Sequence, residues 1–269
     1  MKLGTNTEPF ESLNIAYFVM NVLSVSIYCS QGLFLTCSVL DCMEAFSKGV
    51  HRALVPMESH VENVVAAELV ESSPGYRMLT QMDVVSFLRA HNTELDYVIS
   101  YTVGELGAVN ENVLSITTGT RVIDALKSMR AASLSSVPIV EAHGNVTDEH
   151  VLLDGKGKKL VSTFSATDLR ACPIDLLQQW LNVSVVEFKD KASSMHGATA
   201  PTVLGADRAR CLVTCRRETT LAQVIEEAVA SRVHRVWVVD VRGRLLGLVS
   251  LSDMLRVIRE ALLVAERET

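Results

Sequence analysis

Three pairs of residues, each a hydroxyl and a carboxylate three positions apart, have side chains suited to holding a small polar ligand. The pairs are Thr80 with Asp83, Ser165 with Asp168, and Ser250 with Asp253. Each pair follows a short apolar run and opens a helical pattern, so it can cap the N-terminus of a helix. The same pair can instead bind a ribose diol, because a carboxylate accepts hydrogen bonds from two hydroxyls. The spacing leaves both interpretations open.

Two histidine–arginine dipeptides suggest a second kind of chemistry. His51-Arg52 and His234-Arg235 each enter a short apolar run, and Ser135-Ser136 takes the equivalent place between them. A guanidinium fork matches the geometry of phosphate oxygens, so we interpret both dipeptides as phosphate contacts. The alternative is a pair of structural side chains with no ligand.

These residues recur because the chain repeats one pattern three times. Each repeat has an amphipathic helix, a short strand, a turn, a second strand and a helix opened by the aspartate. Repeat one spans residues 36–92, repeat two 113–172 and repeat three 207–262. Repeat three has the tightest turn, Val241 to Arg244, which predicts a β-hairpin. Residues 193–206 are expected to connect repeats two and three. The expected fold class is therefore α/β (α+β), built from tandem repeats.

The composition excludes several classes of protein. The chain has 269 residues, 48% of them hydrophobic, which excludes a largely disordered chain. A net charge of -6 gives no reason to expect nucleic-acid binding. Residues 207–269 nevertheless carry eleven arginines against nine acidic residues, which indicates either a local anion site or a solvated arginine-rich surface. The six cysteines form no CxxC pair, so we expect free thiols and no metal site.

No sequence motif of catalysis stands out. GxSxG, HExxH and glycine-rich phosphate loops do not occur in the sequence. Residues 155–159 (GKGKK) are superficially similar to a phosphate loop, but they fit the hairpin loop of repeat two better. We therefore expect a non-enzymatic protein without catalytic residues or a cofactor.

Residues 1–35 do not follow the repeat pattern. The segment from Ser12 to Leu35 is uncharged and, at 24 residues, long enough to cross a bilayer of about 30 Å. Asparagine, serine and glutamine residues dilute it, and no cluster of basic residues flanks it, so a membrane anchor is the less favoured interpretation. The alternatives are a helix or strand packed on the core, or an alternative first exon without a designed role.

The order of helix, strand, hairpin and strand-[ST]-x-x-Asp-helix resembles the cystathionine-beta-synthase (CBS) domain. The segments GVHRALVP, RVHRVWVVD and GLVSLSDML resemble the gamma regulatory subunit of AMP-activated and sucrose-non-fermenting-related protein kinases. LDCMEAFSKGVHRALVP with YRMLTQMDVVSFL is most similar to the plant gamma-like branch. The resemblance covers residues 36–262. It implies that repeats two and three pair as one complete Bateman module, and that repeat one is unpaired because the first of four family repeats is missing.

The same resemblance implies a function. A non-catalytic subunit would bind AMP, ADP or ATP between repeats two and three and modulate a Ser/Thr protein kinase. Its partners would be kinase catalytic and beta-type subunits, without nucleic acid or membrane, in the cytoplasm and/or the nucleus. The implied ribose contacts are Asp83, Asp168 and Asp253, helped by Thr80, Ser165 and Ser250; the implied phosphate contacts are His51, Arg52, His234 and Arg235; Thr117 and Thr118 would line the adenine cleft.

The sequence departs from the family pattern at several positions. Ser135-Ser136 supplies no charge in repeat two, and Gln81, Met82 and Asp83 stand where the kinase subunits carry basic residues. An unpaired repeat one would expose an apolar face, which the N-terminal segment or a second chain would cover by self-association. We also expect residues 100–269 to fold alone. The alternative function is a CBS scaffold that binds protein partners without sensing nucleotide.

Overall fold

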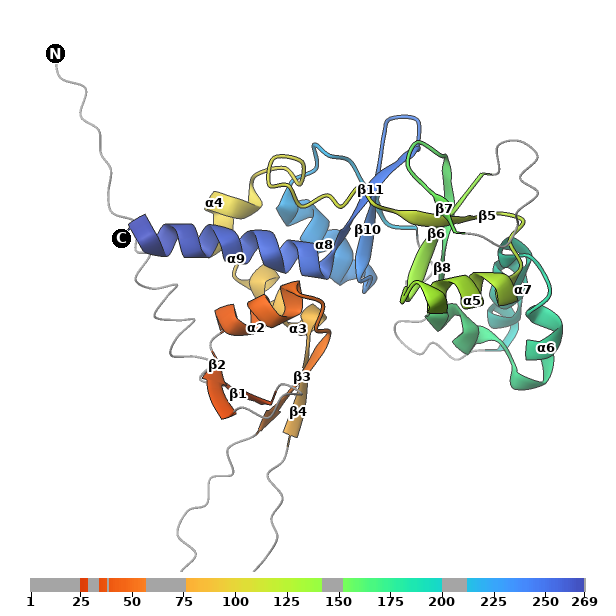
Figure 1. The fold of residues 1–269 in the computed structure, drawn as a ribbon, viewed down its shortest axis with the longest axis horizontal. Coiled ribbons are helices and arrows are strands. Elements are labelled where there is room, and N and C mark those ends of the chain that lie inside the picture. Colours follow the sequence, from red (N-terminus) through yellow and green to blue (C-terminus); the bar gives the residue numbers. More distant parts are fainter. Residues whose placement is uncertain are drawn as a thin grey trace, which may run out of the picture. The chain divides into compact units, whose positions relative to one another are not determined.

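The computed structural model describes residues 25–28, 34–37, 39–56, 76–141, 152–199 and 212–268. They form two compact units that alternate along the chain (Figure 1). Unit one takes its residues from 1–108, 220–229 and 250–269, and unit two from 109–219 and 230–249. Helices and strands follow the order predicted for three repeats, so the α/β repeat fold is confirmed.

Repeat one contributes an antiparallel sheet to unit one. Its strands are β1 (Val25–Tyr28), β2 (Phe34–Cys37), β3 (Arg52–Pro56) and β4 (Tyr76–Thr80), in the order β2-β1-β3-β4. In the N-terminal segment, residues 25–28 form β1 and residues 34–35 belong to β2. Its other residues lie outside the described part. Among the described residues, the structure contains no helix that is long and apolar enough to span a bilayer.

The helices of repeat one pack against the last helix of the chain. Unit one contains α2 (Val39–Ser47), α3 (Gln81–Ala90), η1 (Asn92–Leu95), α4 (Asp96–Ile99) and α9 (Leu251–Glu268). Both α2 and α3 contact α9, and each of the three helices buries an apolar stripe (Figure 1). Arg259 of α9 donates from Nε to the carbonyl oxygen of Leu40 at 3.2 Å and forms an ion pair with Glu44. The apolar helix faces of repeat one are thus covered by repeat three.

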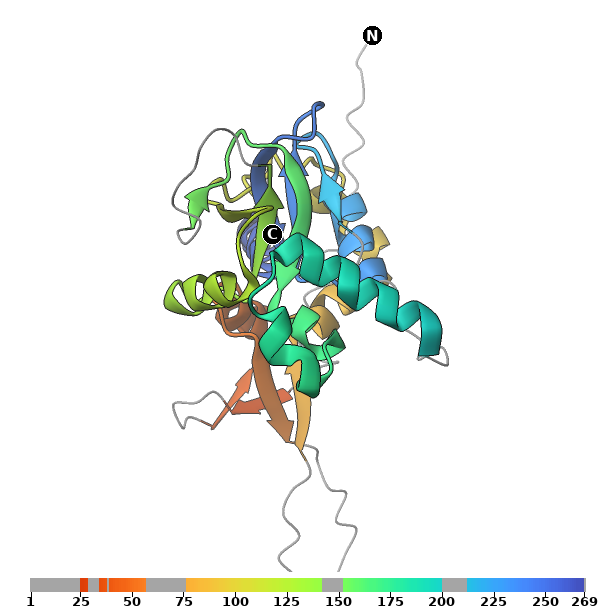
Figure 2. The same cartoon turned by 90° about the vertical axis from the view of Figure 1, so that its right-hand side faces the viewer.

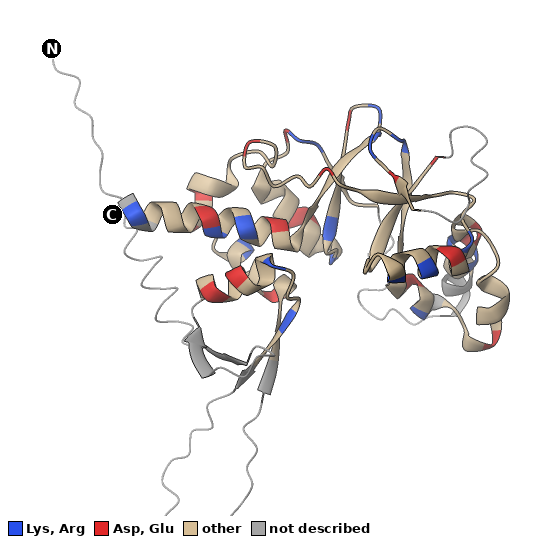
Figure 3. Cartoon of the chain, in the orientation of Figure 1, with Lys and Arg blue, Asp and Glu red and all other residues tan. Residues whose placement is uncertain are grey.

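This packing argues against an independent fold for residues 100–269. Met254 and Ile258 of α9 are fully buried, and α2 and α3 provide part of the surface that covers α9. A chain that begins at residue 100 would keep α9 but lose both of these helices. Figure 3 shows acidic and basic residues interspersed along α9, which suits a helix with one face in water.

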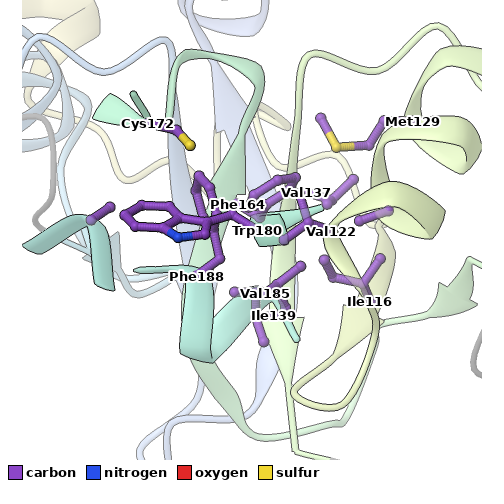
Figure 4. Packing of buried hydrophobic residues seen from close by; sticks show 12 residues of the cluster. Ile116, Val122, Met129, Val137, Ile139, Phe164, Cys172, Trp180, Val185 and Phe188 are labelled. Carbon is purple, nitrogen blue, oxygen red and sulfur yellow. The ribbon is translucent and has the colours of Figure 1, made fainter. Parts of the chain in front are cut away.

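Repeat two lies within unit two. Its elements are β5 (Leu114–Thr117), α5 (Val122–Ala131), β6 (Ser136–Val140), β7 (Leu153–Asp154), β8 (Leu160–Ser165), η2 (Ala166–Ala171), η3 (Ile174–Leu176), α6 (Leu177–Trp180) and α7 (Val185–Thr199). The sheet order is β7-β5-β6-β8, with β5 parallel to β6. Helix α5 contacts α7 (Figure 2). Phe164, Phe188 and Trp180 stack edge to face in the core that these elements enclose (Figure 4).

Two expectations for repeat two are wrong in detail. The segment opened by Asp168 is a 3-10 helix of six residues, η2, instead of an α-helix. Pro173 explains its end, because proline disfavours the helical conformation at the preceding residue, and Cys172 is extended. The expected connector begins as helix, since α7 continues to Thr199. Residues 200–206 lie outside the described part.

The strands of repeat three directly contact those of repeat two. They are β9 (Thr214–Cys215), β10 (Arg235–Val239) and β11 (Leu245–Ser250), with α8 (Leu221–Ser231) between β9 and β10. The turn between β10 and β11 is the predicted hairpin, with Gly243 at a φ of 73°. Leu245 donates its N–H to the carbonyl oxygen of Lys158 at 2.8 Å, and Leu160 donates to that of Gly243 at 3.0 Å. Val113, Val140, Leu160, Trp237 and Leu245 are buried together at this contact.

Candidate functional site

All three hydroxyl–carboxylate pairs lie where a strand ends and a helical segment begins. In repeat three, Asp253 Oδ2 accepts from the Ser250 N–H at 2.9 Å and from its Oγ at 2.5 Å. In repeat one, Asp83 Oδ2 accepts from the Thr80 N–H at 2.8 Å and from its Oγ1 at 2.7 Å. Each hydroxyl oxygen also accepts from the N–H of its aspartate at 3.2 Å. Both pairs are therefore reciprocal capping boxes.

Capping does not exclude ligand binding at these two pairs. The capping bonds of Asp83 and Asp253 all end on Oδ2. An ionised carboxylate has two oxygens with about four lone pairs, so Oδ1 can still accept from the hydroxyls of a ligand. Asp83 is exposed and Asp253 is half-buried. The two interpretations of the spacing are thus compatible, and the cap holds the carboxylate in a fixed orientation.

The pair in repeat two is arranged differently. Asp168 Oδ2 accepts from the Ser165 N–H at 2.9 Å, as in the other repeats. Ser165 and Asp168 thus also form a reciprocal capping box, here at the start of the 3-10 helix η2. The Ser165 hydroxyl in addition donates to the carbonyl oxygen of Ser135 at 3.3 Å and accepts from the Thr167 N–H at 3.3 Å. Ser165 therefore ties the start of η2 to the residue just before β6, where a histidine–arginine dipeptide stands in the other repeats.

Arg235 of repeat three reaches this same point within unit two. Its Nη1 donates to the carbonyl oxygen of Ser136 at 3.0 Å, and its Nη2 donates to the Oγ of Ser135 at 3.0 Å. Burial lowers the pKa of its guanidinium from the usual value. A path of residues therefore runs from Arg235 to Asp168: Arg235 contacts the Ser135 side chain, the Ser135 carbonyl oxygen accepts from the Ser165 hydroxyl, and the Ser165 N–H donates to Asp168. Repeat two has no arginine of its own at this position, and repeat three places one there.

The histidines of the two dipeptides differ in their surroundings. His51 Nδ1 lies 3.0 Å from the Oε1 of Gln81, and Gln81 Nε2 donates to the Oγ of Ser252 at 2.8 Å. Gln81 thus links the histidine of repeat one to the first turn of α9, beside Asp253. His234 is exposed and immediately precedes β10. Arg52 is exposed and lies opposite Thr80 in the β3–β4 register.

The threonines implied to line the adenine cleft belong to the turn before α5. Thr117 is buried, and its Oγ1 lies 3.1 Å from the Oγ1 of Thr120. The Thr117 N–H donates to the same Thr120 oxygen at 3.1 Å, and the Thr118 N–H donates to the carbonyl oxygen of Val140 at 3.2 Å. Thr117 therefore has a structural partner, and half-buried Thr118 is the more accessible of the two.

Sequence reasoning missed Gln81, Ser135 and Ser252 as bridging residues. The sequence marks Gln81 and Ser135 only as departures from the repeat pattern, and the structure shows that Gln81 is buried at the first position of α3. Nothing in the sequence marks Ser252. The contacts of Ser135 and Ser252 could not be predicted, because their partners lie far away along the chain.

The basic hairpin loop of repeat two does not form a phosphate loop. Lys156 forms an ion pair with Glu111, and Arg217 forms a second one with the same carboxylate. Hydrogen bonds from these two cations lower the pKa of Glu111 to about 2. Within the ranges that the structure describes, no cluster of histidine, cysteine or acidic residues has the composition of a metal site. Burial raises the pKa of the Cys215 thiol to about 12, so this cysteine is a poor nucleophile.

Comparison with known proteins agrees with this architecture. A model of the CBS domain matches residues 103–173 and 209–260. The SNF1-related protein kinase regulatory subunit gamma-like PV42b of Arabidopsis thaliana is 46% identical over 247 residues, covering 90% of this chain and 68% of that protein. The chain belongs to this gamma-like family. Its PV42a member from the same plant is 42% identical over 251 residues, with the same shares covered.

More distant relatives of this gamma-like protein extend the comparison. The 5'-AMP-activated protein kinase subunit gamma of Saccharomyces cerevisiae is 26% identical over 236 residues, covering 87% of this chain and 61% of that protein. The crystal structure of an archaeal homologue of gamma-AMPK from Methanocaldococcus jannaschii matches with a TM-score of 0.53 at 18% identity. That match covers 82% of this chain and 64% of the archaeal one, and it supports the fold alone.

Proposed function

We propose that this gamma-like protein is a non-catalytic regulatory subunit that binds adenine nucleotide and modulates an SNF1-related Ser/Thr protein kinase. Its relatives are named as regulatory or gamma subunits of such kinases. The observation that carries nucleotide binding is the path from Arg235 to Asp168 within unit two. It joins a guanidinium suited to phosphate with a carboxylate suited to a diol, and a nucleotide contains both groups.

The partners of Arg235 leave room for a ligand to compete. Its present acceptors are a hydroxyl and a carbonyl, which are both neutral. A phosphate carries the opposite charge and matches the guanidinium fork with two parallel hydrogen bonds, so it would be the better acceptor. A guanidinium has five N–H donors, so Arg235 can bind phosphate while it keeps one contact to repeat two. Exposed His234 would add a second donor beside it.

The proposed mechanism is linkage. A nucleotide held by Arg235 of repeat three and Asp168 of repeat two would favour the arrangement of strands in which both residues reach it. A kinase partner that contacts both repeats would then bind the nucleotide-loaded form with a different affinity. The expected partners remain the kinase catalytic and beta-type subunits.

Isothermal titration of the full chain with AMP, ADP and ATP tests the nucleotide step. Arg235→Ala removes two charged hydrogen bonds, so affinity should fall by about tenfold or more, on a scale of 1.5–3 kcal/mol. Arg242→Ala is the matched control, because Arg242 is an exposed arginine in the β10–β11 hairpin of the same repeat. Binding by the control and not by Arg235→Ala supports the proposal. Absence of heat and of any thermal shift at millimolar nucleotide overturns it.

A scaffold without nucleotide sensing is the second candidate, and the capping boxes favour it. Thr80 with Asp83 and Ser250 with Asp253 are fully explained as caps. Co-purification with kinase subunits, followed by mass spectrometry of proteins and retained nucleotide, separates the candidates. A complex that forms without nucleotide and is unchanged by Arg235→Ala supports the scaffold. A complex that retains adenine nucleotide, and loses it on this substitution, supports the sensor.

A further inference from the structure

Two apolar side chains on one face of the sheet of repeat one are open to solvent. Leu54 of β3 is 46% exposed and Met78 of β4 is 56% exposed. The two residues are register partners across the antiparallel pair, so their side chains point to the same face. Val50, just before β3, is a further exposed apolar side chain. Exposed apolar residues gathered on one sheet face mark an interaction surface.

The other repeats identify what this face is built to contact. The β6–β8 register pairs Pro138 with Thr163, so these residues occupy the positions of Leu54 and Met78. Aligning the histidine–arginine dipeptides places Trp237 of repeat three at the position of Leu54. The Trp237 indole donates from Nε1 to the Oγ1 of Thr163 at 2.5 Å, and Trp237 is only 3% exposed. The positions through which repeats two and three meet are therefore the positions that repeat one leaves open.

We propose that two copies of this chain associate through the face of repeat one that carries Leu54 and Met78. The buried cluster of unit two shows that a sheet face of this kind is covered by the equivalent face of another repeat. Among the described residues, repeat one is the repeat whose face remains open, so the matching occupant is repeat one of a second chain. Such an interface is isologous, and Leu54 of each chain would meet Met78 of the partner across a two-fold axis.

This proposal does not depend on nucleotide binding, because Leu54 and Met78 lie in unit one, outside the path from Arg235 to Asp168. Its test is the mass of the full chain in solution, measured by sedimentation velocity over a series of concentrations. We expect a dimer. Leu54→Asp and Met78→Lys should each raise the dimer dissociation constant by about tenfold or more, because a charge is buried without a partner and the interface contains it twice. Val241→Asp, at a position 79% exposed in the hairpin of unit two, should leave the dimer unchanged.

A mixing experiment tests the predicted register. A chain with Leu54→Asp mixed with a chain carrying Met78→Lys should form a heterodimer, because the new carboxylate would face the new ammonium group. Each variant alone should dimerise about tenfold or more weakly than the unmodified chain, with the far-UV circular dichroism of that chain.

Three outcomes overturn the proposal. A monomeric full chain at its highest soluble concentration would mean that another part of the chain, or a different protein, covers the face. A dimer that survives both single substitutions would lie elsewhere on the molecule. Failure of the mixed chains to pair more tightly than either variant alone would contradict the predicted contact between Leu54 and Met78.

Discussion

Arg235 of repeat three donates a hydrogen bond from Nη2 to the Oγ of Ser135 of repeat two, at 3.0 Å. Arg235 also donates from Nη1 to the carbonyl oxygen of Ser136. The two bonds join repeats two and three at the point where repeat two lacks its own arginine. A lysine keeps the charge but has no planar fork, so it cannot make both bonds in the same geometry.

The first prediction concerns the stability that this contact provides. Arg235→Lys and Arg235→Ala should both lower the free energy of unfolding, by about 1–3 kcal/mol, with the larger loss for alanine. Urea unfolding followed by circular dichroism measures it. Arg242→Lys in the exposed hairpin is the control and should change stability little. Equal stability of all variants would contradict a structural role for Arg235.

The second prediction concerns Gly247 in the centre of β11. A Cβ atom at this position would lie 2.7 Å from the Asn110 carbonyl oxygen and 2.7 Å from the Cγ1 of Val109. Gly247→Ala should therefore destabilise unit two by about 1–3 kcal/mol, because the backbone cannot give way easily. Gly119→Ala is the matched control, since a Cβ there meets nothing within 4 Å. Thermal unfolding of both variants provides the measurement.

The third prediction separates capping from ligand binding at Asp253. Asp253→Ala should lower stability by about 0.5–1.5 kcal/mol, because α9 loses its capping carboxylate and a favourable charge at its N-terminus. Asp253→Asn retains an acceptor and should cost less. If Asp253 also binds a nucleotide diol, as the family resemblance implies, nucleotide affinity should fall in both variants, since the diol needs the charged carboxylate. If nucleotide affinity falls only as far as the loss of stability explains, Asp253 acts as a cap alone.

The fourth prediction is a pH dependence that arises from Glu111. Its ion pairs with Lys156 and Arg217 lower its pKa from 4.5 to about 2. A folded-state pKa below the unfolded value stabilises the protein above pH 4.5, and this contribution disappears as the pH falls from 4.5 toward 2. The difference in unfolding free energy between the unmodified chain and Glu111→Gln should shrink over this interval. Glu227→Gln, on the exposed face of α8, serves as control.

The fifth prediction follows from the contact of α2 and α3 with α9. A chain shortened to residues 100–269 should be less stable than the full chain and should aggregate, because the apolar face of α9 would lose part of its cover. Circular dichroism melting and size-exclusion chromatography test this. A monomeric fragment that unfolds at the temperature of the full chain would contradict it.

The sequence predicts the features of this fold that depend on neighbouring residues. The hairpin at Val241 to Arg244 and the caps at Thr80 and Ser250 are correct because a few adjacent positions determine them. It does not predict the partner of Arg235, which is about one hundred positions away along the chain. The 3-10 segment of repeat two was also missed, because the same Ser-x-x-Asp pattern opens both kinds of helix.

The candidate site was predictable to a similar extent. The sequence shows which residue types could bind a phosphate and a diol, but it does not show which residues contact them in the fold. From the sequence, Gln81 is interpreted as a substitution that weakens a basic site. The structure places it between His51 and Ser252. Thr117 reads as a cleft residue, but its hydroxyl is buried beside that of Thr120. Both outcomes depend on packing between segments that are distant in sequence or on a turn that periodicity does not reveal.

The serines at 135 and 136 also limit how the repeats can evolve. If repeat two carried an arginine at position 136, its guanidinium would compete with that of Arg235 for the same half-buried space, and two like charges would meet there. The two repeats are therefore no longer interchangeable, although they share a common pattern. A gene conversion that copied the strand of Arg235 over that of Ser136 would create this repulsion. Selection can thus preserve the difference between Ser136 of repeat two and Arg235 of repeat three.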